Sequence, residues 1–218
     1  MKTIVKVTVL SILSLTLGLS SMASSDCCQT ADQALAKLKE GNKHFVTHRM
    51  KHPDETITRR KELQKGQHPF VAILSCSDSR VPPEIIFDQG LGDIFEIRNA
   101  GNVLDDHVIG SLEYAVAHAG VKLIVVMGHD DCGAVKATLG HAHESIYIQS
   151  LTQSIEPAAK ISKGKGDALV NETAKNHAKL TVAQILKSDP IIADYVETKG
   201  VKVIPAIYHL DSGQVEFF

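Results

Sequence analysis

Two short apolar runs constrain the fold of this chain more than any other feature. The first, "FVAIL", ends at Leu74, and the second, "KLIVVM", begins at Lys122. Both runs are continuous rather than alternating, which is typical of strands that are covered on both faces. Strands of this kind occur in parallel sheets with a layer of helices on each side.

Helical periodicity accounts for much of the remaining chain. Apolar residues recur at helical spacing from Thr30 to about His48, behind a threonine N-cap. Further helices are predicted at residues 55–65, 105–118, 145–161, 167–187 and 190–199, and further strands at residues 93–97, 201–210 and 214–218. This order predicts an α/β fold, a mostly parallel central sheet flanked by helices, with an N-terminal helical extension. The N-terminal stripe has no obvious partner within so small a domain.

The first residues have the pattern of a secretory signal peptide. Two lysines form a basic n-region, residues 7–19 carry no charge, and Ser21 and Ala23 are small residues at the positions that signal peptidase reads. The uncharged run is shorter than the about 20 residues that cross a bilayer, which argues against a transmembrane anchor. We therefore expect a signal peptide at residues 1–23, a single domain at residues 24–218, no membrane span after cleavage, and a periplasmic or secreted location.

The charge balance gives no sign of a polyanionic partner. The formal net charge is −2 at pH 7, and no basic cluster is dense enough to predict binding to nucleic acid or to a membrane surface. Aromatic residues make up 5% of the chain and Trp is absent, so the core is expected to be mostly aliphatic.

The four cysteines need an explanation in an exported chain, where free thiols tend to be oxidised. Cys27 and Cys28 are neighbours in a polar leader, where a bridge between them would be strained, and their role stays open. Cys76 and Cys132 follow the two apolar runs, and the carboxyl ends of parallel strands meet at one edge of a sheet. Either a disulfide or a shared metal ion would explain this second pair.

His129 favours the metal ion. It lies three positions before Cys132 in "HDDC", and with Cys76 these residues offer one imidazole and two thiolates. Zinc accepts such ligands, and three protein ligands leave its fourth position open, as in catalytic rather than structural zinc sites. The sequence thus predicts one Zn²⁺ per chain, which would also protect both thiolates from oxidation.

Asp78 and Arg80 follow Cys76 at alternate positions in "CSDSR". A carboxylate so close to a zinc ligand can bind the metal or accept a hydrogen bond from its water. An arginine beside it can hold the carboxylate through two parallel hydrogen bonds. We interpret the pair as catalytic, and an ordinary salt bridge is the alternative.

The motifs "CSDSR", "IRNAGN", "SLEYAVAHAG" and "GHDDCG" together resemble the β-class carbonic anhydrases, over most of residues 30–210. The resemblance implies a helix-flanked, mostly parallel sheet, assembly into homodimers or higher homo-oligomers, and a pocket at the subunit interface. It also implies that the helix within residues 30–49 reaches across to a neighbouring subunit, so we expect that helix in the interface. It implies that the zinc ligands are Cys76, His129 and Cys132 and that the catalytic dyad is Asp78 and Arg80. It implies that the substrate-binding residues are Gln67, Phe95, Ala100, Tyr114 and Gly133.

Two details refine the resemblance. Gln67, Phe95 and Tyr114 are similar to the pocket of the plant-type subgroup, whose aspartate stays off the metal. Other members bind a regulatory bicarbonate beside a Trp three residues before the first zinc cysteine, where this chain has Ile73. We therefore expect a plant-type active site without that second pocket in its usual form.

The activity implied by the resemblance is the reversible hydration of carbon dioxide to bicarbonate and a proton. Zinc-bound hydroxide would attack carbon dioxide, with the hydroxide oriented by Asp78 and Asp78 oriented by Arg80. The group that accepts the proton stays open among four histidines, His107, His118, His141 and His143. Two other functions also stay open: hydrolysis of carbon disulfide or carbonyl sulfide, and a non-catalytic exported zinc-binding or thiol-redox protein.

Overall fold

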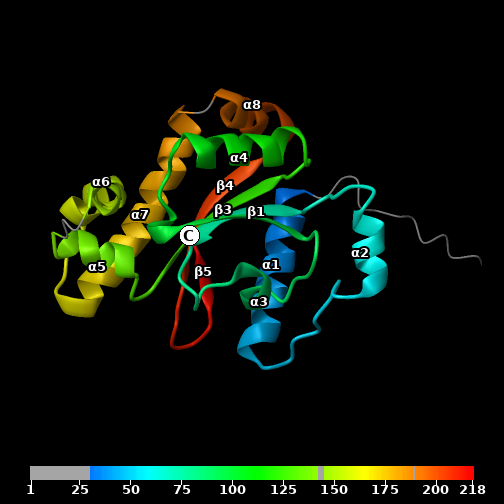
Figure 1. Cartoon of the computed structure of the whole chain (residues 1–218), viewed down its shortest axis with the longest axis horizontal. Coiled ribbons are helices and arrows are strands. Elements are labelled where there is room, and N and C mark those ends of the chain that lie inside the picture. The colour runs from blue at the N-terminus through cyan, green and yellow to red at the C-terminus, as the bar shows by residue number, and fades with distance from the viewer. Residues whose placement is uncertain (1–29, 142–144, 189) are drawn as a thin grey trace, which may run out of the picture.

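A five-stranded sheet with the strand order β2-β1-β3-β4-β5 forms the centre of the computed structural model, which describes residues 30–141, 145–188 and 190–218 (Figure 1). The strands are β1 (Val71–Cys76), β2 (Ile94–Asn99), β3 (Leu123–His129), β4 (Lys202–Tyr208) and β5 (Val215–Phe217). Strands β1 to β4 are parallel to their neighbours, and β5 is antiparallel to β4. The predicted α/β class and mostly parallel sheet are confirmed.

Helices cover both faces of this sheet. They are α1 (Ala31–Val46), α2 (Ile57–Leu63), α3 (Pro83–Ile86), α4 (Asp106–Ala117), α5 (Gly133–Leu139), α6 (Ile146–Ile161), α7 (Gly166–Ser188) and α8 (Pro190–Lys199), with a 3₁₀ turn, η1 (Ala100–Asn102). Helices α1 and α3 pack on one face, and α4, α7 and α8 pack on the other (Figure 1). Helices α5 and α6 lie beside α7 at the side of the sheet.

The continuous apolar runs explain why both faces are covered. Successive side chains of a strand point to opposite faces. In β3, Leu123 and Val125 enter the core beneath α1, whereas Ile124 and Val126 enter the core beneath α4, α7 and α8. All residues of β3 are buried, so an alternating polar pattern would have placed polar groups in one of the two cores.

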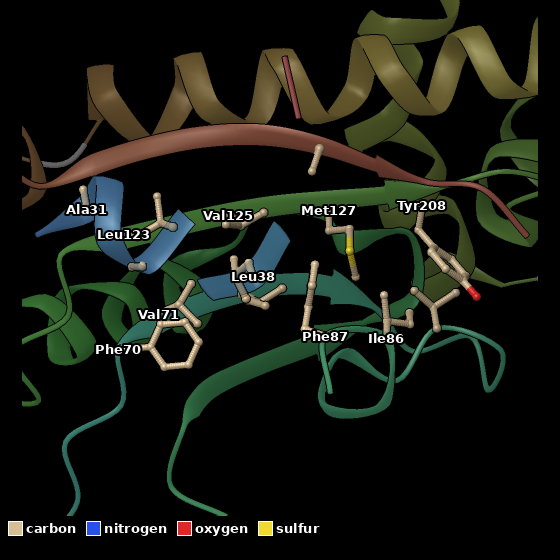
Figure 2. Close-up of a cluster of buried hydrophobic side chains, with 14 residues drawn as sticks. Ala31, Leu38, Phe70, Val71, Ile86, Phe87, Leu123, Val125, Met127 and Tyr208 are labelled. Carbon is tan, nitrogen blue, oxygen red and sulfur yellow. The ribbon is translucent and has the colours of Figure 1, made fainter. Parts of the chain in front are cut away.

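The apolar stripe of α1 packs within its own chain, which corrects the expectation that it lacks a partner there. Ala31 is 2% exposed and Ala34 and Leu38 are 0% exposed. Figure 2 shows Ala31 and Leu38 beside residues of the sheet, including Val71 and Val125. The stripe covers a sheet face that would otherwise be exposed to water, and it gives no reason to place α1 in a subunit interface.

The strands extend further than the apolar runs predict. Cys76 pairs with Asn99 at the end of β1, and His129 pairs with Tyr208 at the end of β3. Polar and small residues end an apolar pattern without ending the hydrogen-bonded ladder. Consequently, two predicted metal ligands sit on the rigid sheet rather than on loops.

Some expectations concern residues outside the described part of the chain. The predicted signal peptide at residues 1–23, Cys27, Cys28 and His143 all lie there. Among the described residues, no helix has the length and apolar character that a membrane span requires.

Candidate metal centre

Three potential metal ligands converge at the carboxyl edge of the sheet. Cys76 ends β1, His129 ends the adjacent parallel strand β3, and Cys132 is the N-cap residue of α5. One ligand atom from each residue lies within 4.8 Å of the others, and all three residues are buried. The expected convergence at the strand ends is thus present in the fold.

The imidazole of His129 is oriented for a metal ion. Its Nδ1 lies 2.8 Å from the backbone carbonyl oxygen of Asp130, and because a carbonyl only accepts, Nδ1 carries the proton. The other ring nitrogen, Nε2, therefore presents a lone pair. Nε2 is buried and has no hydrogen-bond partner in the protein. A ring whose first nitrogen donates to a carbonyl and whose second faces a metal is typical of zinc-binding histidines.

The chemistry of the two thiols also favours a cation bound between them. Both are free rather than joined in a disulfide. A hydrogen bond from the Cys132 thiol lowers the pKa of Cys76 well below its usual range. The pKa of Cys132 is raised far above its usual range, because its proton is held by Cys76 and its loss would leave two buried thiolates together. A divalent cation removes this conflict, so the residues present fit a zinc ion.

A backbone amide supports the sulfur of Cys76. Gly101, in the turn η1, donates its N–H to Cys76 Sγ at 3.3 Å. Gly101 has a left-handed φ of 75°, and a Cβ there would lie 2.8 Å from both Ala134 Cβ and Ile155 Cδ1. Only glycine fits this position without displacing its neighbours, so the "IRNAGN" stretch requires a glycine here.

Asp78 and Arg80 form a bidentate ion pair beside these ligands. Arg80 donates from Nε to Asp78 Oδ1 at 2.9 Å and from Nη2 to Asp78 Oδ2 at 2.8 Å. The guanidinium holds the pKa of the Asp78 carboxyl well below its usual range. Asp78 Oδ2 lies 4.0 Å from His129 Nε2, so the ionised carboxylate faces the ligand cluster.

Comparison with known proteins decides the family. A family model described as carbonic anhydrase matches residues 71–215. The carbonic anhydrase of Mycolicibacterium smegmatis is 42% identical to this chain over 183 residues, which cover 82% of this chain and 89% of that relative. This chain belongs to the carbonic anhydrase family.

Solved structures agree with the β class. The β-carbonic anhydrase CafA of Aspergillus fumigatus is 29% identical, with a TM-score of 0.69 over 86% of this chain and 89% of that one. A tetrameric β-carbonic anhydrase of Sordaria macrospora shares the fold at 22% identity, with a TM-score of 0.68 over 82% of this chain and 93% of that one. β-Carbonic anhydrases are zinc lyases, and the Cys-His-Cys cluster of this chain provides a site that can bind a metal.

Two residues that our sequence analysis did not single out also contact the site. Arg98 donates from Nε to the carbonyl of Cys76 at 2.9 Å and from Nη2 to the carbonyl of Asp78 at 2.7 Å. Asp131 lies 3.4 Å from Nη1 of Arg80, on the side away from Asp78. Arg98 lies inside the motif "IRNAGN" and Asp131 inside "HDDC", and membership of these motifs was the sequence signal that could have identified them. Their contacts depend on how the loops fold, which spacing does not reveal.

The predicted substrate-binding residues of this carbonic anhydrase fall into two groups. Ala100 and Gly133 are exposed and are the chain neighbours of Gly101 and Cys132, so they border the ligand cluster. Phe95 pairs with Ala72, four residues before Cys76, which puts it about 13 Å down the sheet. Tyr114 lies against Phe95, with ring centroids 6.1 Å apart, and Gln67 precedes β1 altogether. One chain does not bring this second group to its own ligand cluster.

Proposed function

We propose that this chain is a zinc-dependent carbonic anhydrase that catalyses the reversible hydration of carbon dioxide to bicarbonate and a proton. The observation that carries the proposal is the bidentate Asp78–Arg80 pair facing the three convergent ligands, with Asp78 Oδ2 4.0 Å from His129 Nε2. A purely structural zinc site needs no oriented carboxylate beside it, whereas a hydration catalyst does.

One zinc ion per chain would be held by the Cys76, His129 and Cys132 side chains, which leave one coordination position open. When bound, zinc supplies a Lewis acid that makes water ionise near neutral pH. The chain contributes a rigid and buried ligand set, because two of the three ligands end hydrogen-bonded strands.

Asp78 acts as a selective hydrogen-bond acceptor. Arg80 keeps its carboxylate ionised, so Asp78 can accept a hydrogen bond but not donate one. It would therefore select a hydroxyl donor and turn that oxygen's free lone pair toward carbon dioxide. Because both Asp78 oxygens are already held by Arg80, the carboxylate is less available to bind the metal itself, as in the plant-type subgroup.

The pocket is proposed to be completed by a second copy of the chain. Tyr114 is 52% exposed although it is aromatic, and it lies with Phe95 at the β2 edge of the sheet. Gln67, Phe95 and Tyr114 would line the pocket of a partner subunit, with Gln67 as a donor to a substrate oxygen and the two rings as apolar walls. The tetrameric relative from Sordaria macrospora supports assembly of at least a homodimer.

The test is metal analysis of the purified protein combined with a carbon dioxide hydration assay. We expect one zinc per chain and rapid hydration, with little hydrolysis of carbon disulfide or carbonyl sulfide. Metal-replete protein that hydrolyses the sulfur compounds but does not hydrate carbon dioxide would identify a hydrolase instead. A zinc-containing protein without either activity would indicate a binding function.

We also propose that the chain is exported to the periplasm or secreted, with cleavage after Ala23. The proposal rests on the basic, uncharged and small-residue pattern of the first 23 residues. Mass spectrometry of the N-terminus after expression and cell fractionation would test it. A protein that retains residues 1–23 in the cytoplasm would contradict it.

A further inference from the structure

His177 lies in the core of this protein, behind the turn that supports the zinc ligand Cys76. It belongs to α7, and it is 4% exposed. Its Nε2 lies 3.1 Å from the carbonyl oxygen of Gly101, so Nε2 carries the proton and donates it. The histidine is neutral, since burial lowers its pKa to about 4. It has no place in the proposed chemistry, because it does not contact Asp78, Arg80 or the open face of the ligand cluster.

Gly101 receives support on both of its sides. Its N–H donates to Cys76 Sγ at 3.3 Å, and its carbonyl accepts from His177. A glycine with a left-handed φ has no side chain of its own to fix it, and its backbone has more conformational freedom than that of any other residue. The two groups lie in successive peptide planes, so a hydrogen bond on the carbonyl restricts the rotations about φ and ψ of Gly101 that would turn its N–H away from the sulfur.

The rest of the turn does not provide this restraint. Asn99 closes the turn by accepting from the N–H of Val103 at 2.8 Å and donating to its carbonyl at 2.9 Å. Those bonds fix the ends of η1. The carbonyl of Gly101, at the centre of η1, accepts its hydrogen bond from His177. Helix α7 therefore reaches the sulfur of Cys76 through two hydrogen bonds in series.

We infer that His177 is a positioning residue for the zinc ligand Cys76, acting through the Gly101 backbone to aim an N–H at the thiolate sulfur. A hydrogen bond to a metal thiolate reduces the electron density that the sulfur donates, and such outer contacts tune both the affinity and the reactivity of a metal site. The inference deepens the proposed function and rests on zinc binding by Cys76.

The experiment compares three variants. His177→Phe keeps a ring and removes the donor, whereas His177→Gln keeps an N–H donor near the position of Nε2. The matched control is Thr173→Val, one turn earlier on the same helix, because Thr173 is 0% exposed and its hydroxyl donates only within α7, to the carbonyl of Leu169 at 2.7 Å. Chelator competition measures zinc affinity, and the near-ultraviolet thiolate-to-cobalt band of cobalt-loaded protein reports on the sulfur.

We expect His177→Phe to bind zinc about tenfold or more weakly, because the Cys76 thiolate, the form that binds zinc, would lose a hydrogen bond that stabilises its charge and its position. Its cobalt band should shift to longer wavelength, because a thiolate without the hydrogen bond gives up its electrons more readily. His177→Gln should recover most of the affinity and the wild-type band, and Thr173→Val should match wild type in both. A folded His177→Phe protein with wild-type zinc affinity and an unmoved band would overturn the inference.

A second measurement starts from the wild-type protein, which carries no risk of unfolding, and is then extended to two variants. In the wild-type zinc protein, the Gly101 amide proton should be strongly protected from hydrogen exchange, and its protection should fall in His177→Gln by less than in His177→Asn, whose amide is too short to reach. A Gly101 amide that exchanges freely in wild type would also overturn the inference. Failure of the wild-type protein to bind zinc would instead overturn the proposed function, so the two failures are distinguishable.

Discussion

The two ends of β1 differ in what one chain supplies. At the carboxyl end, Cys76, His129 and Cys132 form a buried and complete ligand set, with Asp78 and Arg80 beside it. Towards the amino end, Phe95 and Tyr114 lie against each other and Gln67 precedes the strand, and these exposed or partly exposed residues lie away from the chain's own ligand cluster. The difference teaches that one chain brings the three metal ligands together by itself, whereas the proposed substrate pocket would need a second chain.

The largest expected effect concerns the metal end. Cys132→Ala should lose zinc and with it essentially all carbon dioxide hydration, because two ligands do not hold the ion, and Cys76→Ala and His129→Ala should behave alike. Phe95→Ala is the control at the other end and should keep one zinc per chain. Metal analysis and the hydration assay check both. Zinc retained in Cys132→Ala, or lost in Phe95→Ala, would break the proposed division between the two ends.

Arg80→Ala should have the next largest effect. The variant should keep its zinc, because Arg80 is not a ligand, but turnover should fall roughly 10²-fold or more, as expected when one preorganised hydrogen-bonding group is lost. Asp78 would lose both guanidinium contacts and could turn onto the metal. Near-normal turnover in this variant would mean that the bidentate pair is only a salt bridge.

Substitutions at the amino end should lower activity less, and the residues there should serve the metal centre of the partner subunit. Removing the aromatic wall with Tyr114→Ala should lower kcat/KM about tenfold and leave zinc binding intact. Co-expression with Cys132→Ala should produce hybrids in which an intact metal centre faces an intact wall, so activity should exceed the mean of the two parents. A mixture equal to that mean would show that both ends serve the same chain. Light scattering of the active species should also exclude a monomer.

Asp131→Asn should have a smaller effect on activity. Asp131 contacts Arg80 at 3.4 Å from the solvent side, and exposed ion pairs contribute little. We expect less than about a tenfold loss of kcat with unchanged zinc content. A loss as large as that of Arg80→Ala would mean that Asp131 is the main anchor of the guanidinium.

The smallest effect at neutral pH is expected for the stability of the metal-free protein when His177, within the metal end, is replaced by Gln. Its pKa is about 4 in the folded protein and 6.5 when unperturbed, so unfolding takes up a proton between these values. Stability from the neutral ring is present above pH 6.5 and is lost as the pH falls towards 4, by about 2 kcal/mol between pH 7 and pH 5. Urea unfolding of metal-free wild type and of His177→Gln measures the free energy of unfolding of each protein at both pH values. Cys76 titrates in both proteins, so its contribution cancels in the difference between them. Equal pH slopes would contradict a buried neutral histidine.

The sequence predicted the metal end far better than the rest. Cys76, His129 and Cys132 were identified because strand ends in a parallel sheet share one edge, so position along the chain translates into position in space. Asp131 and Arg98 were missed because their contacts arise from loop conformation, which has no period. The short helices α3 and α5 were missed for a similar reason, since they contain too few residues to establish a repeat.

The stripe of α1 shows the opposite failure. Its helical period was predicted correctly, but the stripe was expected to lack a partner within its own chain, and Leu38 instead packs against the sheet. Periodicity identifies an apolar face without naming its partner, and a sheet with two continuous apolar strands already required a cover on that side. Phe95 and Tyr114 lie at an edge of the sheet, where a single chain leaves them partly exposed.

The placement of Cys76 and His129 on two separate parallel strands also couples metal and fold. These strands pair directly but are joined through β2 and α4, so the ligands meet only after a long crossover has closed. An unfolded chain offers no such cluster, so zinc that binds the native state draws the folding equilibrium towards it by mass action. Each tenfold rise in free zinc above the dissociation constant should add about 1.4 kcal/mol to the free energy of unfolding. The metal supply of its compartment would then help to set how long this enzyme lasts as well as how fast it works.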